Sequence, residues 1–97
     1  MMELLEKPIH PGEVLAEVYL KPSAFSITVT ELAESIDVSP MELSMFIEGK
    51  HSLTTSLAAR LAMRFKTTTA YWVGLQMSYD RRAQAFKLLK LHRQVKG

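Results

Sequence analysis

Apolar residues recur every three or four positions along most of the chain, the spacing that places side chains on one face of an α-helix. Strand-like alternation never persists long enough to indicate a β-sheet. The pattern therefore predicts an all-α fold of five helices followed by a basic helical segment. The expected apolar faces are Val14, Leu15, Val18 and Tyr19; Leu32, Ala33 and Ile36; Leu43, Phe46 and Ile47; Leu57, Ala58, Leu61, Ala62 and Phe65; Tyr71, Trp72, Leu75 and Tyr79; and Ala85, Leu88, Leu89, His92 and Val95.

Proline and threonine residues mark several of the expected helix ends. Pro11 suits the first position of a helix, because its missing N–H would have no partner there. Lys21-Pro22 should end that helix, since the residue before a proline is pushed out of the α region. Later helices are expected to open at Thr54 and near Thr68.

Two consecutive helices carry the same capping pattern. Thr28 is followed three residues later by Glu31, an arrangement in which each residue bonds a backbone N–H of the other. Ser39 repeats the device, with Pro40 at the first helical position and Glu42 three residues after the cap. Both helices therefore have a well-defined predicted start.

The two helices are joined and ended by residues that tolerate a left-handed backbone. Asp37 stands in the predicted turn, and aspartate adopts that conformation more easily than most residues other than glycine. Gly49 should end the second helix in the same conformation. Two capped helices with a turn of about four residues are typical of a helix-turn-helix, here at about 28–48.

Composition places the chain among soluble single-domain proteins. It has 97 residues, 47% of them hydrophobic, enough for one packed core. The absence of cysteine excludes disulfides and thiolate metal sites. Neither a signal-peptide pattern nor an apolar run of about 20 residues is present, so we expect a cytoplasmic protein with no membrane partner.

The formal net charge of +2 conceals an asymmetry along the chain. Residues 1–80 hold six Lys or Arg and all ten acidic residues, a net −4, whereas residues 81–97 hold six Lys or Arg and no acid, a net +6. We therefore expect a helix-turn-helix domain over 1–80 and a basic C-terminal helical extension over 81–97. The extension is either a solvated basic face or a surface that docks a partner or a second copy, and the pattern favours neither.

Catalytic and metal-binding patterns are absent from the sequence. His10, His51 and His92 are far apart, with no carboxylate or cysteine pattern beside them. No nucleophile elbow or glycine-rich phosphate loop occurs. Trp72 falls in an apolar set and is expected in the core rather than stacked on a ligand. The sequence thus favours a binding protein with no cofactor and no metal over an enzyme.

Motifs spread over roughly residues 7–80 resemble those of one known family. They are His10-Pro11-Gly12-Glu13-Val14-Leu15; Thr30-Glu31-Leu32-Ala33-Glu34; Val38-Ser39; Leu43-Ser44; Gly49-Lys50; Leu53-Thr54; Arg60-Leu61-Ala62; Phe65; Trp72; Leu75-Gln76; and Tyr79-Asp80. Together they resemble the HigA/VapI antitoxins, a branch of the lambda-repressor-like helix-turn-helix proteins. The two end motifs at matching spacing make this more specific than a helix-turn-helix pattern alone.

The resemblance implies a five-helix DNA-binding domain that forms a homodimer, binds double-stranded operator DNA beside its own gene and neutralises a cognate ribonuclease toxin. In such proteins the second helix of the motif lies in the major groove, with its N-terminal residues near base edges. The base-facing residues implied by position are Ser39, Pro40, Met41, Ser44, Met45 and Glu48. Further contacts are expected from Lys50 and His51, and from Thr54 and Thr55 at the start of the next helix, where free N–H groups suit a phosphate.

This chain departs from the family at the residues that read DNA. Direct readout relies on Arg or Lys for guanine and Asn or Gln for adenine, and family members commonly carry Arg or Asn where Pro40, Met45 and Glu48 stand. Residues 28–48 contain no Lys or Arg but five acids. Met41 and Met45, expected on the outer face, offer instead an adaptable apolar contact.

Three functions remain open at the level of sequence. The leading one is an antitoxin-type transcriptional repressor whose DNA binding is weak or of low specificity. The second is a protein-interaction module that keeps the fold but has lost DNA binding. The third is an orphan repressor that binds DNA and has no toxin.

Overall fold

The computed structural model describes residues 8–20 and 27–96, with side chains described as far as His92. Within these residues all regular structure is helical, which confirms the predicted all-α fold. The elements are α2 (Pro11–Val14), η1 (Leu15–Tyr19), α3 (Val29–Ser35), α4 (Pro40–Ile47), α5 (Thr55–Phe65) and α6 (Thr69–Lys96). The helix end predicted at Lys21-Pro22 lies outside the described residues, as does the side chain of Val95.

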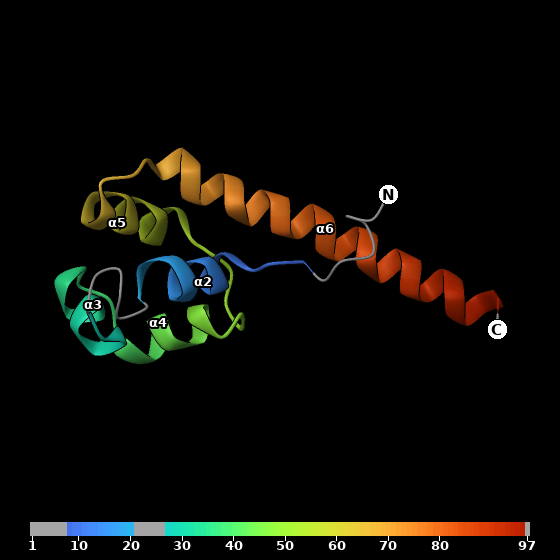
Figure 1. Ribbon diagram of the computed structural model, residues 1–97, viewed down its shortest axis with the longest axis horizontal. Helices are drawn as coiled ribbons and strands as arrows, with labels where there is room; N and C mark the ends of the chain where they lie inside the picture. Colours follow the sequence, from blue (N-terminus) through green and yellow to red (C-terminus); the bar gives the residue numbers. More distant parts are fainter. Residues whose placement is uncertain (1–7, 21–26, 97) are drawn as a thin grey trace.

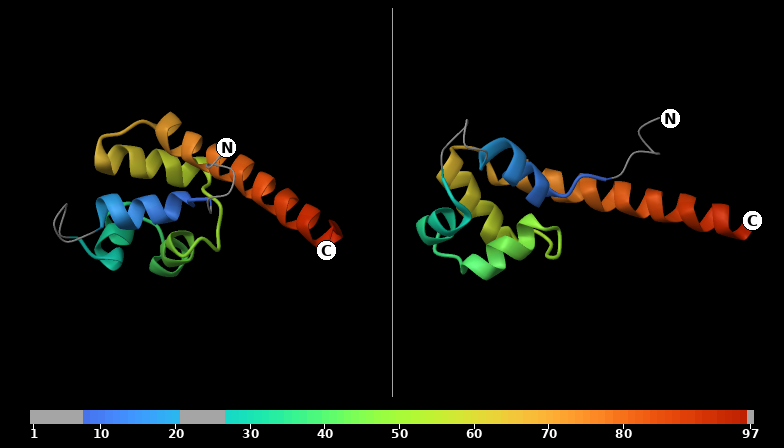
Figure 2. Two further views of the ribbon diagram at one scale, coloured as in Figure 1. Left: turned by 45° about the vertical axis from the view of Figure 1, so that its right-hand side comes forward. Right: turned by 60° about the horizontal axis from the view of Figure 1, so that its bottom comes forward.

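The helices form a small bundle from which α6 projects. α2 packs against both α4 and α6, α3 packs against α4 and α5 against α6, and the second half of α6 extends well past the other helices (Figures 1 and 2). The projecting helix accounts for the elongated dimensions of 50 × 24 × 23 Å. The bundle alone therefore positions α4, and the basic half of α6 stands apart from it.

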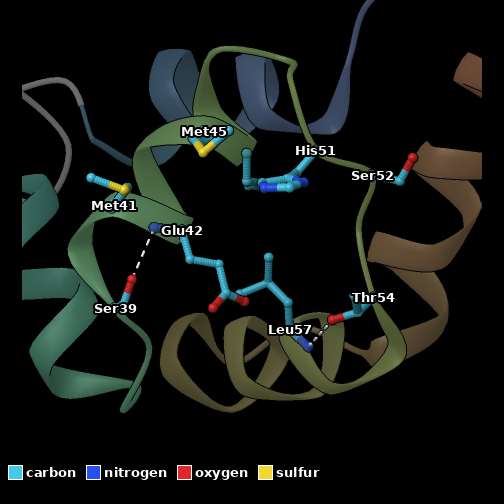
Figure 3. Close-up of a pocket in the computed structure, with 9 residues that line it drawn as sticks. Ser39, Met41, Glu42, Met45, His51, Ser52, Thr54 and Leu57 are labelled. Atoms are coloured by element: carbon cyan, nitrogen blue, oxygen red, sulfur yellow. Dashed lines mark hydrogen bonds between the residues drawn. The ribbon is translucent and has the colours of Figure 1, made fainter.

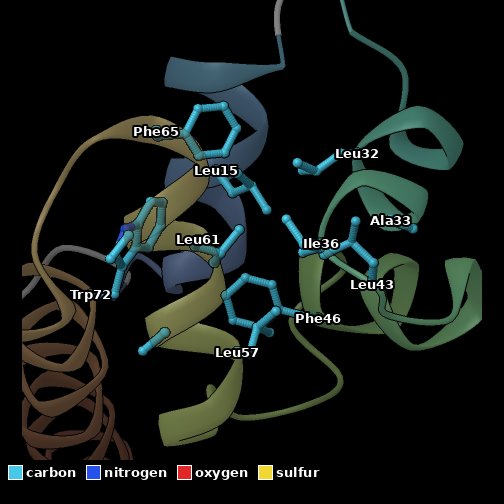
Figure 4. Packing of buried hydrophobic residues seen from close by; sticks show 12 residues of the cluster. Leu15, Leu32, Ala33, Ile36, Leu43, Phe46, Leu57, Leu61, Phe65 and Trp72 are labelled. Carbon is cyan, nitrogen blue, oxygen red and sulfur yellow. The ribbon is translucent and has the colours of Figure 1, made fainter.

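η1, α3, α4, α5 and α6 all contribute to one apolar core (Figure 4). Leu61 of α5 lies near its centre, with Trp72 of α6 on one side and Leu32 of α3 on the other. The buried residues are Leu15, Leu32, Ala33, Ile36, Leu43, Phe46, Leu57, Ala58, Leu61, Ala62, Phe65 and Trp72. The apolar faces predicted for 29–36 and 55–65 are thus confirmed, and Trp72 is a core residue as expected.

The prediction that Val18 belongs to the buried face of the first helix is wrong, since its side chain is 52% exposed. The cause is η1, a π-helical turn in which the amide of Leu20 donates to the carbonyl of Leu15 at 3.1 Å. An i→i+5 turn holds more residues than an α turn and rotates the following side chains about the axis. Tyr19 consequently faces the core, with its ring 4.6 Å from that of Phe65 and 5.4 Å from that of Trp72.

The helix near Thr68 and the basic segment after Asp80 are one continuous helix rather than two. No proline interrupts residues 69–96, and the side-chain amide of Gln76 bonds Asp80 one turn later at 2.9 Å. Leu88 and Leu91 on the projecting half are 58% and 47% exposed. A boundary between residues 80 and 81 is therefore not marked by a break in the helix.

The local caps form largely as predicted. Thr28 and Glu31 complete a capping box, with bonds of 2.9 and 3.1 Å. These hydrogen bonds from Thr28 hold the pKa of the Glu31 carboxyl below its usual range. Asp37 and Gly49 have φ of 59° and 79°, the left-handed conformation expected of both.

The second capping pattern is only half formed. Oγ of Ser39 accepts from the amide of Glu42 at 3.0 Å, so the cap itself is confirmed. The Glu42 side chain, however, does not complete a reciprocal box and extends across toward Leu57 of α5 (Figure 3). The packing of α5 beside α4 gives this carboxylate a different environment from that of Glu31.

Core and surface positions should differ sharply in a truncation series. Leu32→Ala, Leu61→Ala and Trp72→Ala are each expected to lower the free energy of unfolding by roughly 2–5 kcal/mol, because each leaves a cavity in the shared core. Met41→Ala should lower it by less than about 1 kcal/mol, because that side chain faces solvent. Urea denaturation of the four variants measures this. A loss for Met41→Ala equal to that for Leu61→Ala would contradict the assignment of helix faces.

Candidate nucleic-acid interface

The outward face of α4 is a mixed apolar and acidic surface. Leu43 and Phe46 bury its inner side, so Met41, Ser44, Met45 and Glu48 fall on the other. Met41 is 74% exposed, while Ser44 and Met45 are half-buried. As the sequence predicted, no Arg, Lys, Asn or Gln is present on this helix.

A groove of about 480 Å³ runs between α4 and the segment that leads into α5 (Figure 3). Met41, Met45 and Glu42 border it on the α4 side, and His51 and Thr54 face them from the other. The complete lining is Ser39, Met41, Glu42, Met45, Phe46, His51, Ser52, Thr54 and Leu57. The groove therefore has an apolar floor, formed by Phe46 and Leu57, and a rim of mixed polarity.

Half of the ten residues implied in DNA contact line this groove. Those brought together are Ser39, Met41, Met45, His51 and Thr54, while Pro40, Ser44, Glu48, Lys50 and Thr55 do not line it. Glu42, Phe46, Ser52 and Leu57 complete the lining without having been expected there. Glu42 was assigned to a cap and the two apolar residues to the core, so only the packing of α5 against α4 reveals their place in the groove.

Lys50, the nearest cation to α4 in sequence, is engaged with an acid. Its Nζ lies 3.2 Å from Oε1 of Glu48, and both side chains are more than half exposed, at 65% and 56%. An exposed pair of this kind contributes only about 0–1 kcal/mol to stability. It nevertheless places a negative charge beside the ammonium group that would otherwise approach a phosphate.

Arg60 is a second cation near this surface, and the sequence did not single it out as a contact residue. Its Nη1 donates to the carbonyl of Ile36 at 2.7 Å and its Nε to Oγ of Ser56 at 3.4 Å. It borders a polar cavity of about 240 Å³ whose lining includes Ser39 and Thr54. Arg60 therefore joins the end of α3 to the start of α5, and its position depends on a contact between residues 24 apart in sequence.

Other kinds of site find little support in the described part of the chain. No three His, Cys, Asp or Glu side chains among residues 8–20 and 27–92 gather closely enough to hold a metal ion. Of the helices that the structure describes, none is both long and apolar enough to cross a membrane. The groove beside α4 remains the candidate site.

Comparison with known proteins identifies the family. No family model matches the chain, and the identification rests on similar proteins and solved structures. The uncharacterized HTH-type transcriptional regulator YbaQ of Escherichia coli K12 is 38% identical over 80 residues, which cover 82% of this chain and 69% of that protein. Virulence-associated protein I of Dichelobacter nodosus is 36% identical over 72 residues, covering 74% and 65%. The Pseudomonas aeruginosa antitoxin HigA, solved with the higBA promoter, matches with a TM-score of 0.71 at 27% identity, covering 91% and 90%.

The chain belongs to the HigA/VapI family of helix-turn-helix regulators. Membership confirms the resemblance carried by the motifs at both ends of the domain. It also places the chain among DNA-binding regulators and antitoxins rather than among enzymes.

The His-Pro-Gly signature of this HigA/VapI protein joins α2 to α4. Nδ1 of His10 accepts from the amide of Gly12 at 2.9 Å and so caps α2. A Cβ on Gly12 would overlap the carbonyl oxygen of Phe46, so only glycine allows this approach of the two helices. Gly49, just after α4, lies beside the same histidine: a Cβ added to it would be 3.7 Å from the His10 ring.

His10 is buried among aromatic rings from two other helices. Its ring centroid lies 5.4 Å from that of Phe46 on α4 and 4.9 Å from that of Tyr79 on α6. Burial lowers the pKa of His10. Burial has the largest effect, although a hydrogen bond with the backbone of His51 and the carboxylates of Glu13 and Asp80 act in the opposite direction. The neutral imidazole is therefore the form that fits this site.

In this family member, Gln76 anchors the segment between α4 and α5 (residues 48–54) near its C-terminal end. Its Oε1 accepts from the amide of Leu53 at 2.8 Å, and its Nε2 donates to Asp80. The loop that carries Lys50 and His51 is thus tied to α6 at Leu53 and to α2 through His10. Sequence reasoning found Gln76 only as part of a family motif, because the bond spans 23 residues.

Protonation of His10 should make stability depend on pH. Histidine in the unfolded chain has a pKa near 6.5, and the pKa of His10 in the folded chain is lower. As the pH falls through about 6.5, the unfolded state therefore binds more protons than the folded state. The free energy of unfolding decreases as a result. His10→Asn keeps an acceptor for the Gly12 amide but cannot titrate. It should be less stable than the parent near pH 7.5 and should lose less stability between about pH 7.5 and about pH 5.5.

Urea denaturation at the two pH values measures this difference, with His51→Asn as the matched control because His51 is exposed. The control should keep the pH dependence of the parent. An equal loss of stability on acidification in the parent and in His10→Asn would rule out His10 as the source.

Proposed function

We propose that this protein is an antitoxin-type transcriptional regulator that binds operator DNA through α4 and neutralises a cognate ribonuclease toxin. The observation that carries the proposal is the solvent-facing surface of α4, which packs against His10 and Gly12 through Phe46. The P. aeruginosa member of this family was solved with promoter DNA. In helix-turn-helix proteins, the second helix of the motif enters the major groove. The residues proposed to contact DNA are Ser39, Pro40, Met41, Ser44, Met45, Glu48, Lys50, His51, Thr54 and Thr55.

Phosphate contacts would come from the edges of this surface. The start of α5 offers backbone N–H groups at Thr55 and Ser56, and Oγ1 of Thr54 caps the helix by accepting from Leu57 at 3.0 Å. Lys50 and Arg60 supply positive charge on either side. The carboxylates exposed on α3, the turn and α4 oppose binding, because phosphate neutralisation provides most of the non-specific affinity.

We expect weak salt dependence and modest selectivity when the chain binds its own promoter. Each phosphate neutralised adds about 0.9 to the slope of log affinity against log salt, and few cations are available. Lys50→Glu should weaken binding to promoter and random duplex alike. Glu48→Gln removes the acid beside Lys50 and should strengthen both.

Fluorescence anisotropy on the promoter and on a random duplex, at two salt concentrations, measures these effects. Glu17→Gln is a matched control, because Glu17 is exposed on the first helix rather than beside α4. Absence of binding at low salt would contradict the operator function. A steep slope with strong promoter selectivity would contradict the weak-contact interpretation while leaving that function in place.

Neutralisation of a toxin is supported by the charge of the same region. Glu31, Glu34, Asp37, Glu42 and Glu48 are all exposed. A ribonuclease binds a polyanion and therefore presents positive charge, which these carboxylates complement. A short, basic reading frame beside the gene, whose product forms a complex with this chain on co-expression, would supply the toxin; its absence favours an orphan repressor.

We expect a homodimer, because the half-sites of an operator lie about 34 Å apart and suit a two-fold symmetric protein. Met77, Leu88 and Leu91 are exposed along α6 and offer apolar surface for a second copy. Sedimentation equilibrium at micromolar concentration should give twice the 11.0 kDa chain mass. Leu88→Gln with Leu91→Gln should shift the chain toward monomer, and a monomeric parent would contradict the dimer.

A protein-interaction module without DNA binding is the second candidate. It is favoured by the pairing of Lys50 with Glu48 and by the absence of cations on α4. The DNA titration separates the two, since the module predicts no binding to either duplex at low salt.

A further inference from the structure

We propose that α4 recognises thymine in the operator through its C5-methyl group, using Met41 and Met45 as the contact residues. The inference rests on the proposed operator binding and specifies what the recognition surface reads. Met41 and Met45, which lack the hydrogen-bonding groups usual on a recognition helix, would then determine the preferred DNA sequence.

Met41 and Met45 lie one helical turn apart on the outward side of α4 and both border the groove (Figure 3). Met41 is 74% exposed. The apolar surface of the two side chains is continuous with Phe46 and Leu57 in the groove. The most prominent side-chain chemistry that α4 presents to a major groove is therefore apolar and polarisable rather than hydrogen-bonding.

The four bases differ in what they present to such a surface. In the major groove guanine offers two acceptors, adenine an acceptor and an amino group, and cytosine an amino group, and these groups lose water without gaining a partner when a thioether covers them. Thymine alone carries a methyl group in the major groove. Burying that methyl against methionine removes apolar surface from water on both sides, so the contact favours thymine over the other bases.

Methyl recognition also fits the electrostatics of this surface. Glu42 on α4 and Glu48 at its C-terminal cap disfavour close approach to the acceptor-rich edge of guanine, and although Lys50 pairs with Glu48, α4 itself carries no cation. A methyl contact needs no charge and no donor. Selectivity based on it is accordingly modest, at about fourfold for each buried methyl.

The test replaces thymine by deoxyuridine, which removes only the C5-methyl and keeps the base pair. The promoter segment protected by the protein in a footprint is synthesised in both forms, and anisotropy titrations at one salt concentration give the two affinities. The parent should bind the deoxyuridine duplex about fourfold more weakly for each methyl contacted. The Met41→Ala, Met45→Ala double variant should bind both duplexes equally.

Met63→Ala is the matched control, because Met63 is also an exposed methionine but lies on α5, outside the groove. It should keep the thymine preference of the parent. Circular dichroism melting establishes that the double variant is folded, and both of its substituted side chains lie outside the core.

The outcomes separate this inference from the function on which it rests. Selective promoter binding with equal affinity for the two duplexes overturns methyl recognition and leaves operator binding intact. A thymine preference that persists in the double variant also overturns it, because DNA shape would then be the cause. Failure to bind the promoter at all overturns both.

Discussion

The contact between α2 and α4 at Gly12 is the constraint on which the recognition surface depends. The backbone of α2 lies so close to Phe46 that no side chain fits, and the His10 ring fills the adjoining space between α4 and α6. His10 also caps α2 and lies beside Gly49. These contacts together therefore set the positions of α4 and of the loop that follows it. Three helices and a surface loop are thereby coupled through a single buried imidazole.

Charge is distributed so that the fold and the proposed contact with DNA make opposing demands. Glu31 and Glu42 lie in the first turns of α3 and α4, where a helix favours negative charge. The same acids weaken attraction to phosphate. Lys50 is paired with Glu48, and Arg60 is occupied in holding Ile36 and Ser56. Shape and apolar contact are consequently left to carry much of the recognition by α4.

The projecting half of α6 adds a second, separate surface. It continues the helix that buries Trp72 and Gln76, so its direction is set by the core, although the side chains of Leu88 and Leu91 are exposed. Its basic residues lie away from the acidic helices. A partner or a second copy that covers this half would therefore be held rigidly relative to α4.

Local interactions made much of this fold predictable from sequence, and the site depends on what is not local. Thr28 with Glu31, Ser39, Asp37 and Gly49 act on backbone within a few residues, so their caps and turns were predicted correctly. The buried face of the first helix was not predicted correctly, because the π turn is favoured by packing of Tyr19 on Phe65 and Trp72. The groove, the Gln76–Leu53 bond and the Arg60–Ile36 bond join residues more than a helix apart. Sequence determined which residues α4 presents outward; only the packing of α5 and α6 decided which of them share a cavity.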